Sequence, residues 1–477
     1  MLANYFTENL FNKHTWLILI GLVLFSFILF FLNAEVKTFL ILLLLLIFIT
    51  RWISYYLPQA VLALIALSPF INWQIHLTST VSAPPADLLG IVILLAWLWK
   101  IIRENYGHNQ LKTIKKINWP ALGAFGLFLV IAVISATQSF FIPEGLKYLT
   151  RFIILSYLVY IFLIVNVITQ HQHFIRLIKI YFFTCLLIAV LSFLQYLYNF
   201  DWHSIPRLTP FFLNNFAPLG SNHNLLAELL IPAIPLGMIL IKLRGYQPKL
   251  KNKLLAAVIF IGLVSLLTLS RGGWLALALV IGLTVILLNI EAKHQFNLKN
   301  RLKNVYKKLA RPVLLTLLVV ILIAIPFLTS NEVSLSNTNR LLQWQIGWDT
   351  LSFSPYLGAG PGSFMEIINR DPFFVREFGG NLEAHGWPLK ILAETGWLGL
   401  ATFIIFLIWF FGKKIKIFIK RKNLSCQIII GYALIAAASA VTLQLFTTSY
   451  FTAKMWLPLG ILAAAINIYG TKNARQN

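Results

Sequence analysis

Long apolar runs recur along the whole sequence and constrain its fold more than any other feature. A helix needs about 20 mostly apolar residues to cross a bilayer, and in lipid its backbone groups must be hydrogen-bonded within the helix. The sequence therefore predicts an all-α polytopic membrane protein with about 12 to 14 transmembrane helices. The predicted segments have approximate limits 16–32, 37–50, 53–70, 87–102, 120–137, 149–168, 174–198, 224–241, 254–269, 274–290, 312–328, 389–411, 427–446 and 455–470. Only Arg51 and Trp52 separate the second segment from the third, so these two form either two spans or one bent pair.

The composition excludes the other broad classes of protein. Of the 477 residues, 59% are hydrophobic and 11% are charged. A soluble domain has about 45–50% apolar and about 25% charged residues, so an ordinary soluble enzyme and a disordered chain are both excluded. The two cysteines, Cys185 and Cys426, lie in or beside apolar runs, which indicates neither a disulfide framework nor a thiolate metal site.

The net charge of +24 comes from 39 Lys and Arg residues against 15 Asp and Glu residues. In a soluble protein this excess would suggest a nucleic-acid partner, but cytoplasmic loops of membrane proteins are also rich in Lys and Arg. With the amino terminus in the cytoplasm, 29 of the 39 cations lie inside, giving +26 inside and −2 outside. We therefore predict cytoplasmic termini, contact with anionic membrane lipids and no nucleic-acid partner.

The longest segment outside the membrane is a predicted outer loop over residues 329–388. Loops beyond about 12 to 15 residues are usually functional or disordered, and the aromatic residues of this loop favour function. Within residues 339–353 an apolar stripe at helical spacing predicts a helix lying in the membrane interface. The stripe consists of Leu341, Trp344, Trp348 and Leu351. No linker marks a second domain, so we expect one transmembrane domain, residues 1–477, with this loop inserted.

Ionisable residues gather at the predicted outer ends of the helices and are nearly absent from the bilayer midplane. They are Asp87, Lys147, Arg151, His223, Glu228, Arg271, Lys390 and Glu394. A transporter usually binds its substrate near the midplane. Charged groups at headgroup depth instead favour an enzyme that acts on a lipid-linked substrate.

Three motifs carry residues that suit this chemistry, and each also has a purely structural interpretation. In residues 268–274, Arg271 carries a planar guanidinium group that is suited to binding phosphate. The structural alternative is that this side chain only extends to the membrane–water interface. The adjacent glycines permit a tight turn. His385 precedes a helix that begins near Pro388, where a neutral imidazole can accept a proton, although most lone histidines are surface residues. Residues 220–224, ending at Asn224, are a polar helix start that either caps the helix or binds ligand.

The glycine-rich motif at residues 358–364 has the sequence Gly-Ala-Gly-Pro-Gly-Ser-Phe. It follows no buried strand, and it lies on the side away from cytoplasmic nucleotides, so a dinucleotide site is excluded. A tight loop that shapes the site is the favoured interpretation, with an anion-binding turn as the alternative.

In their order along the chain these motifs resemble the bacterial O-antigen ligase and polymerase superfamily. The resemblance extends from about residue 84 to the end and is most specific over residues 270–400. It implies a polytopic glycosyltransferase of the inner membrane whose site faces the periplasm beneath a partly helical loop. It also implies a polyprenyl-diphosphate-linked glycan as donor, no metal and no cofactor. By the same resemblance, the expected acceptor is a hydroxyl group of a glycolipid, a glycan or a protein.

The resemblance implies that His385 is the base that activates the acceptor hydroxyl and that Arg271 holds the diphosphate, with Arg340 beside it. Position at the outer ends of helices adds further candidates for substrate binding. These are Arg151, Asn224, Lys147 and Glu394. The expected function is O-antigen ligase-like transfer; a polymerase of the same superfamily and a transporter of a solute or lipid-linked saccharide are the alternatives.

Overall fold

The computed structural model describes most of the chain. The described residues are 34–76, 82–106, 117–139, 141–200, 207–213, 216–243, 247–294, 331–380, 382–448 and 452–470. The predicted segments 16–32 and 312–328 lie outside these ranges.

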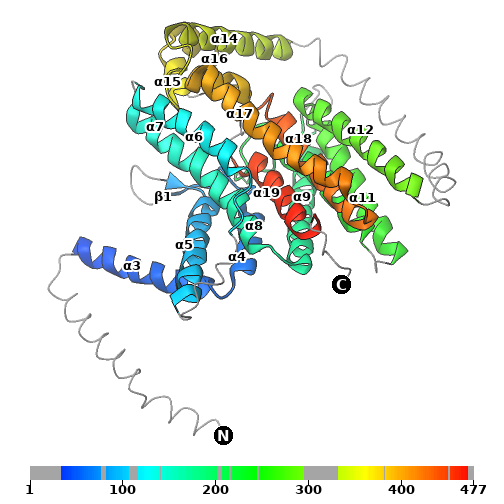
Figure 1. Cartoon of the computed structure of the whole chain (residues 1–477). Helices are drawn as coiled ribbons and strands as arrows, with labels where there is room; N and C mark the ends of the chain where they lie inside the picture. Colours follow the sequence, from blue (N-terminus) through cyan, green and yellow to red (C-terminus); the bar gives the residue numbers. More distant parts are fainter. Residues whose placement is uncertain are drawn as a thin grey trace, which may run out of the picture.

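The described residues are overwhelmingly helical (Figure 1). The first half contains α3 (Ala34–Ile53), α4 (Leu57–Leu67), α5 (Pro85–Tyr106), α6 (Leu122–Thr137), α7 (Ile142–Tyr148), η2 (Leu149–Leu155), η3 (Leu158–Leu163), α8 (Ile164–Val167) and α9 (His171–Tyr198). The second half contains α10 (His223–Lys242), α11 (Pro248–Leu267), α12 (Arg271–His294), α14 (Asn331–Phe353), α15 (Ser363–Asn369), α16 (Pro372–Phe378), α17 (Trp387–Lys420), α18 (Leu424–Leu443) and α19 (Ala453–Tyr469). The described strands are β1 (Ile75–His76) and β2 (Ser82–Ala83), which pair antiparallel.

Eight helices in the described part of the chain are long and apolar enough to cross a membrane. Helices α3 and α4 form one further candidate, a pair bent by 110°, and α6 and α19 are shorter apolar helices. The twelve predicted segments that fall within the described residues all coincide with helical segments, so the prediction of an all-α polytopic membrane protein is confirmed. The second and third segments form the bent pair, because α4 has only 11 residues and is too short to span alone.

Helix α10 lies at the centre of the bundle and packs against α9, α11, α12 and α18. Of its most apolar stretch, 78% is buried, against 28% for α11 and for α12. The apolar side chains of α11 and α12 therefore face outward, where lipid can solvate them, while α10 is enclosed by protein. In Figure 1, α18 lies between α12 and α17.

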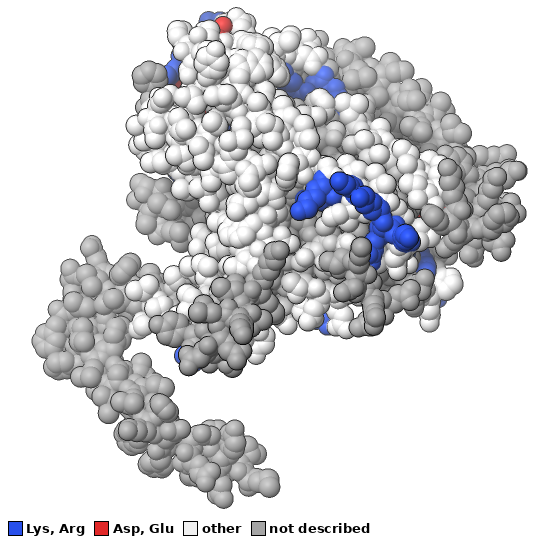
Figure 2. Space-filling model, viewed as in Figure 1, with Lys and Arg blue, Asp and Glu red and all other residues white. Residues whose placement is uncertain are grey.

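The two ends of α17 have different surroundings. Basic residues gather where it ends, in a band that is visible on the face shown in Figure 2. This basic band consists of Lys413, Lys416, Lys420, Arg421 and Lys422. The other end of α17 lies beside α14, α15 and α16, which come from the predicted outer loop (Figure 1). The prediction that this loop is partly helical is confirmed.

Helix α17 is broken at Gly396, whose φ of 66° and ψ of −168° leave the helical region. The break frees backbone groups that a membrane helix cannot leave unbonded. The loop before α15 supplies their partners: Ala359 N–H donates to the Ala393 carbonyl at 3.0 Å, and Trp397 N–H donates to the Pro355 carbonyl at 3.0 Å. The outer loop is thereby fixed to α17 through main-chain hydrogen bonds.

The glycine-rich motif forms this inserted loop. Gly358 has a φ of 68°, and a Cβ at this position would lie 2.5 Å from the Glu394 carbonyl carbon, so only glycine fits. Gly360 N–H donates to the Glu394 carbonyl at 2.8 Å. The motif is thus the predicted tight loop, and these N–H groups are used by α17 rather than offered to an anion.

We predict that Gly460→Ala destabilises the bundle. A Cβ at Gly460 in α19 would lie 1.8 Å from the Tyr160 carbonyl oxygen in η3, so the two helices must move apart. Overpacking of this kind costs about 1–3 kcal/mol. Thermal unfolding of the purified protein in detergent should show a lower Tm. The matched control is Gly282→Ala in α12, where a Cβ meets no atom within 4 Å; equal Tm values for both variants would contradict the packing.

Candidate functional site

Helices α10 and α12 begin close together. Asn222 caps α10, and its side-chain oxygen accepts from Asn224 N–H at 2.8 Å. Ser270 precedes α12, and its hydroxyl oxygen accepts from Gly273 N–H at 3.1 Å and donates to Asn224 Oδ1 at 2.7 Å. Residues from both helix starts line one cavity, so the positive ends of two helix dipoles lie beside the same space.

The glycines of the motif at residues 268–274 serve close packing. A Cβ on Gly272 would lie 2.7 Å from Phe446 Cβ, and a Cβ on Gly273 would lie 3.2 Å from Ala227 Cβ. The left-handed residue of the turn is Leu269, with φ 52°, and not a glycine as expected. Small residues are needed here because α12 begins in direct contact with the chain after α18 and with α10.

Helix α14 covers this space from the outer loop. The guanidinium of Arg271 donates from Nη1 to Asn337 Oδ1 at 2.6 Å and from Nη2 to Ser336 Oγ at 3.4 Å. Further along α14, the fully buried Gln343 accepts from His385 N–H at 2.9 Å. Contacts with α14 therefore set the positions of both the arginine side chain and the histidine backbone.

A cavity of about 130 Å³ lies where these elements meet. It is lined by Arg207, Asn222, His223, Asn224, Leu269, Arg271, Ser336, Arg340 and His385. Four of the seven predicted site residues thus come together here, from four separate parts of the chain. The described lining contains three arginines and two histidines but no acidic residue, so the cavity is electrostatically suited to an anion.

Burial and mutual repulsion lower the pKa values of two basic side chains in this cavity, Arg340 and His385. The pKa of Arg340 is lowered, first by burial and second by the charge of Arg271. The pKa of His385 is lowered to about 4 by burial and by Arg340, against a backbone hydrogen bond at Phe446 that raises it. Arg340 Nε and His385 Nδ1 are buried and have no hydrogen-bond partner among the described residues. At neutral pH the imidazole of His385 is therefore uncharged. An anion bound in the cavity would stabilise the positive charges of the neighbouring arginines.

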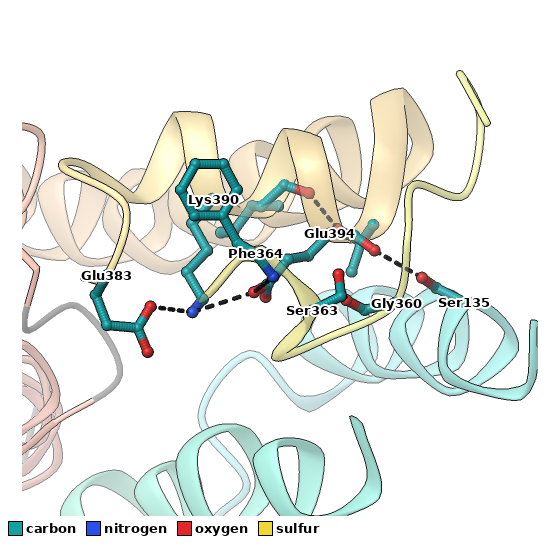
Figure 3. Close-up of polar contacts among 9 residues, drawn as sticks. Ser135, Gly360, Ser363, Phe364, Glu383, Lys390 and Glu394 are labelled. Atoms are coloured by element: carbon teal, nitrogen blue, oxygen red, sulfur yellow. Dashed lines mark hydrogen bonds and ion pairs between the residues drawn. The ribbon is translucent and has the colours of Figure 1, made fainter. Parts of the chain in front are cut away.

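The other three predicted site residues lie outside this cavity. Arg151 Nε pairs with Asp87 Oδ2 at 3.1 Å, which links η2 to α5. Lys147 is exposed in the last turn of α7. Glu394 is buried in α17, where its Oε1 lies 3.1 Å from Lys390 Nζ (Figure 3).

Sequence reasoning did not select two of the basic residues that line the cavity. His223 is among the ionisable residues at the outer helix ends but not among the predicted site residues, although the rule that selects Arg151 applies to it equally. Arg207 lies between the predicted spans 174–198 and 224–241, so position at a helix end does not select it. Among the described residues, no group of three or more His, Cys, Asp or Glu side chains could hold a metal ion.

Comparison with known proteins finds a similarity in the part of the chain that contains the cavity residues. Residues 256–404 match the model of a family described as O-antigen ligase. The matched segment begins within α11 and ends within α17, so it contains Arg271, Arg340 and His385. A search of curated proteins finds no match to the sequence. The similarity to this family thus covers the segment that carries these three residues of the cavity lining.

Proposed function

We propose that this protein transfers a glycan from a polyprenyl-diphosphate carrier to an acceptor hydroxyl at the outer face of the bacterial inner membrane. The observation that carries the proposal is the cavity in which Arg271 and Arg340 lie beside the uncharged His385. The whole chain acts as one transmembrane domain, with the loop at 329–388 covering the site. The match of residues 256–404 to the O-antigen ligase family supports glycan transfer as the reaction class.

The arginines suit the leaving group of this reaction. When the bond from the anomeric carbon to the carrier phosphate breaks, the diphosphate departs with the bonding electron pair and its near phosphate gains negative charge. Guanidinium groups fixed in a partly dehydrated cavity stabilise that charge without reorganising. A volume of about 130 Å³ accommodates the charged head of the donor, while its lipid and most of its glycan lie outside.

His385 suits the role of general base. The acceptor oxygen attacks the anomeric carbon and gives its proton to the imidazole, and the new glycosidic bond forms as the bond to phosphate breaks. Direct displacement inverts the configuration at that carbon. Bound diphosphate neutralises the positive potential of Arg340 and so raises the pKa of His385 from about 4 toward the working pH, which makes the base stronger when the donor is present.

The position of the cavity supports a transferase over a transporter. It lies at the starts of α10 and α12 beneath α14, whereas transporters usually bind substrate at the midplane between broken helices. The same cavity suits a ligase or a polymerase, because both use the same donor chemistry and differ in the acceptor. The assay should therefore test glycolipids, glycans and protein hydroxyls in parallel as acceptors.

We predict that His385→Ala lowers kcat by about 10²–10⁴-fold and that Arg271→Ala lowers kcat by about 10²-fold or more. The measurement is transfer from a polyprenyl-diphosphate glycan to each acceptor, together with binding of the donor. His385→Ala should leave donor affinity nearly unchanged, whereas Arg271→Ala should weaken it.

The matched controls for this experiment are His173→Ala in the first turn of α9 and Arg376→Gln on the exposed part of the outer loop. Neither residue lines the cavity, so both variants should transfer at the native rate. Undiminished transfer by folded His385→Ala or Arg271→Ala would remove that residue from its proposed role.

The lowered pKa of His385 also predicts the pH dependence of transfer. Protonated imidazole cannot accept a proton, so activity falls as pH falls through the pKa. For the free enzyme this pKa is about 4, so kcat/KM should stay level from pH 8 to about pH 5 and decline below it. In the profile of kcat, the acidic limb should lie at higher pH because the diphosphate is bound. A kcat/KM limb near 6.5 would show that the imidazole is not desolvated.

A further inference from the structure

A buried ammonium group lies close to His385 in sequence but outside the cavity. Lys390, in the first turns of α17, has no exposed surface. Its Nζ pairs with Glu383 and with Glu394, the latter at 3.1 Å, and stands 4.3 Å from the centre of the Tyr148 ring. Figure 3 shows Lys390 between the two carboxylates. A buried charge is tolerated only with such partners, so these contacts hold one another in place.

The two carboxylates come from different segments. Glu383 precedes His385 by two residues in the loop, whereas Glu394 follows Lys390 by one turn of α17. Glu394 also accepts at 3.3 Å from the N–H of Phe364, the last residue of the glycine-rich motif (Figure 3). This triad of Lys390, Glu383 and Glu394 thus connects the loop around His385 to the broken part of α17 and to α15.

The chain around His385 is fixed at three points. On one side the carboxylate of Glu383 is held by Lys390. At the centre the His385 N–H donates to Gln343, and on the other side Gly386 N–H donates to the Thr447 carbonyl at 2.9 Å. A catalytic group needs this degree of restraint, because an error of about 1 Å in its position can reduce the rate by about a hundredfold.

We infer that the triad positions the imidazole of His385, with Lys390 and Glu383 as positioning residues that touch no substrate. None of the three residues is among the described residues that line the cavity. The inference rests on the proposed function, because it assigns to the triad the task of holding the base of that reaction. Glu394, selected from the sequence for substrate binding, then acts through Lys390.

The sharpest test is Glu383→Gln. Its carboxylate is partly exposed, and Lys390 keeps Glu394 as a partner, so the variant removes one contact without leaving an unpaired buried charge. We expect kcat to fall about tenfold to a hundredfold, with KM for the donor within twofold of native. Hydrogen–deuterium exchange at residues 382–387 should become faster, while exchange in α14 stays unchanged. The control is Glu377→Gln, an exposed acid of the same outer loop, which should behave as native.

The double variant Glu383→Gln with His385→Ala distinguishes a positioning role of Glu383 from general damage to the structure. If the triad acts through the imidazole, Glu383→Gln causes no further loss of the residual transfer in the His385→Ala background. A native kcat for Glu383→Gln, an equal loss in both backgrounds, or unchanged exchange at residues 382–387 would each overturn the inference. If the native chain transfers no glycan from any donor, the proposed function fails, and the exchange measurement still decides whether the triad fixes the loop.

Discussion

The break in helix α17 is the interaction on which the arrangement of the site depends. At Gly396 the helix gives up its own backbone hydrogen bonds, and another segment must replace them. A Cβ there would lie 2.3 Å from the Tyr356 carbonyl, so the inserted chain is in direct contact with the break. Because the inserted residues belong to the outer loop, their contact with the break holds α14 and the residues around His385 over the starts of α10 and α12.

The described cations on the predicted outer side include two groups with different environments. One group is neutralised by acids, in the pairs Arg151 with Asp87, Lys390 with Glu383 and Glu394, and Lys454 with Glu228. The other group lines the cavity, where the described lining contains no acid. Keeping several guanidinium groups together without acids costs stability, and sites that bind charged ligands commonly bear this cost.

The local physics of the bilayer made much of this molecule predictable. The cost of exposing polar groups to lipid acts on each segment separately, so apolar runs identified the helices within the described residues, and polar residues identified the helix ends. Position at helix ends selected Asn224 together with Arg151, Lys147 and Glu394, whereas the family resemblance implied Arg271, Arg340 and His385. Position alone could not separate Asn224, which lines the cavity, from Arg151, Lys147 and Glu394, because all four share the same predicted depth.

The sequence by itself determined an all-α membrane protein whose chemistry-bearing residues lie at helix ends, since hydrophobicity and backbone hydrogen bonding are properties of local segments. Only the tertiary structure decided which charges are paired. Arg151 meets Asp87 across 64 positions of sequence, and Ser270 meets Asn224 across 46. Neutralisation of a charge depends on its neighbours in space. A cation left for a ligand and one used to hold the fold therefore look alike until the helices are packed.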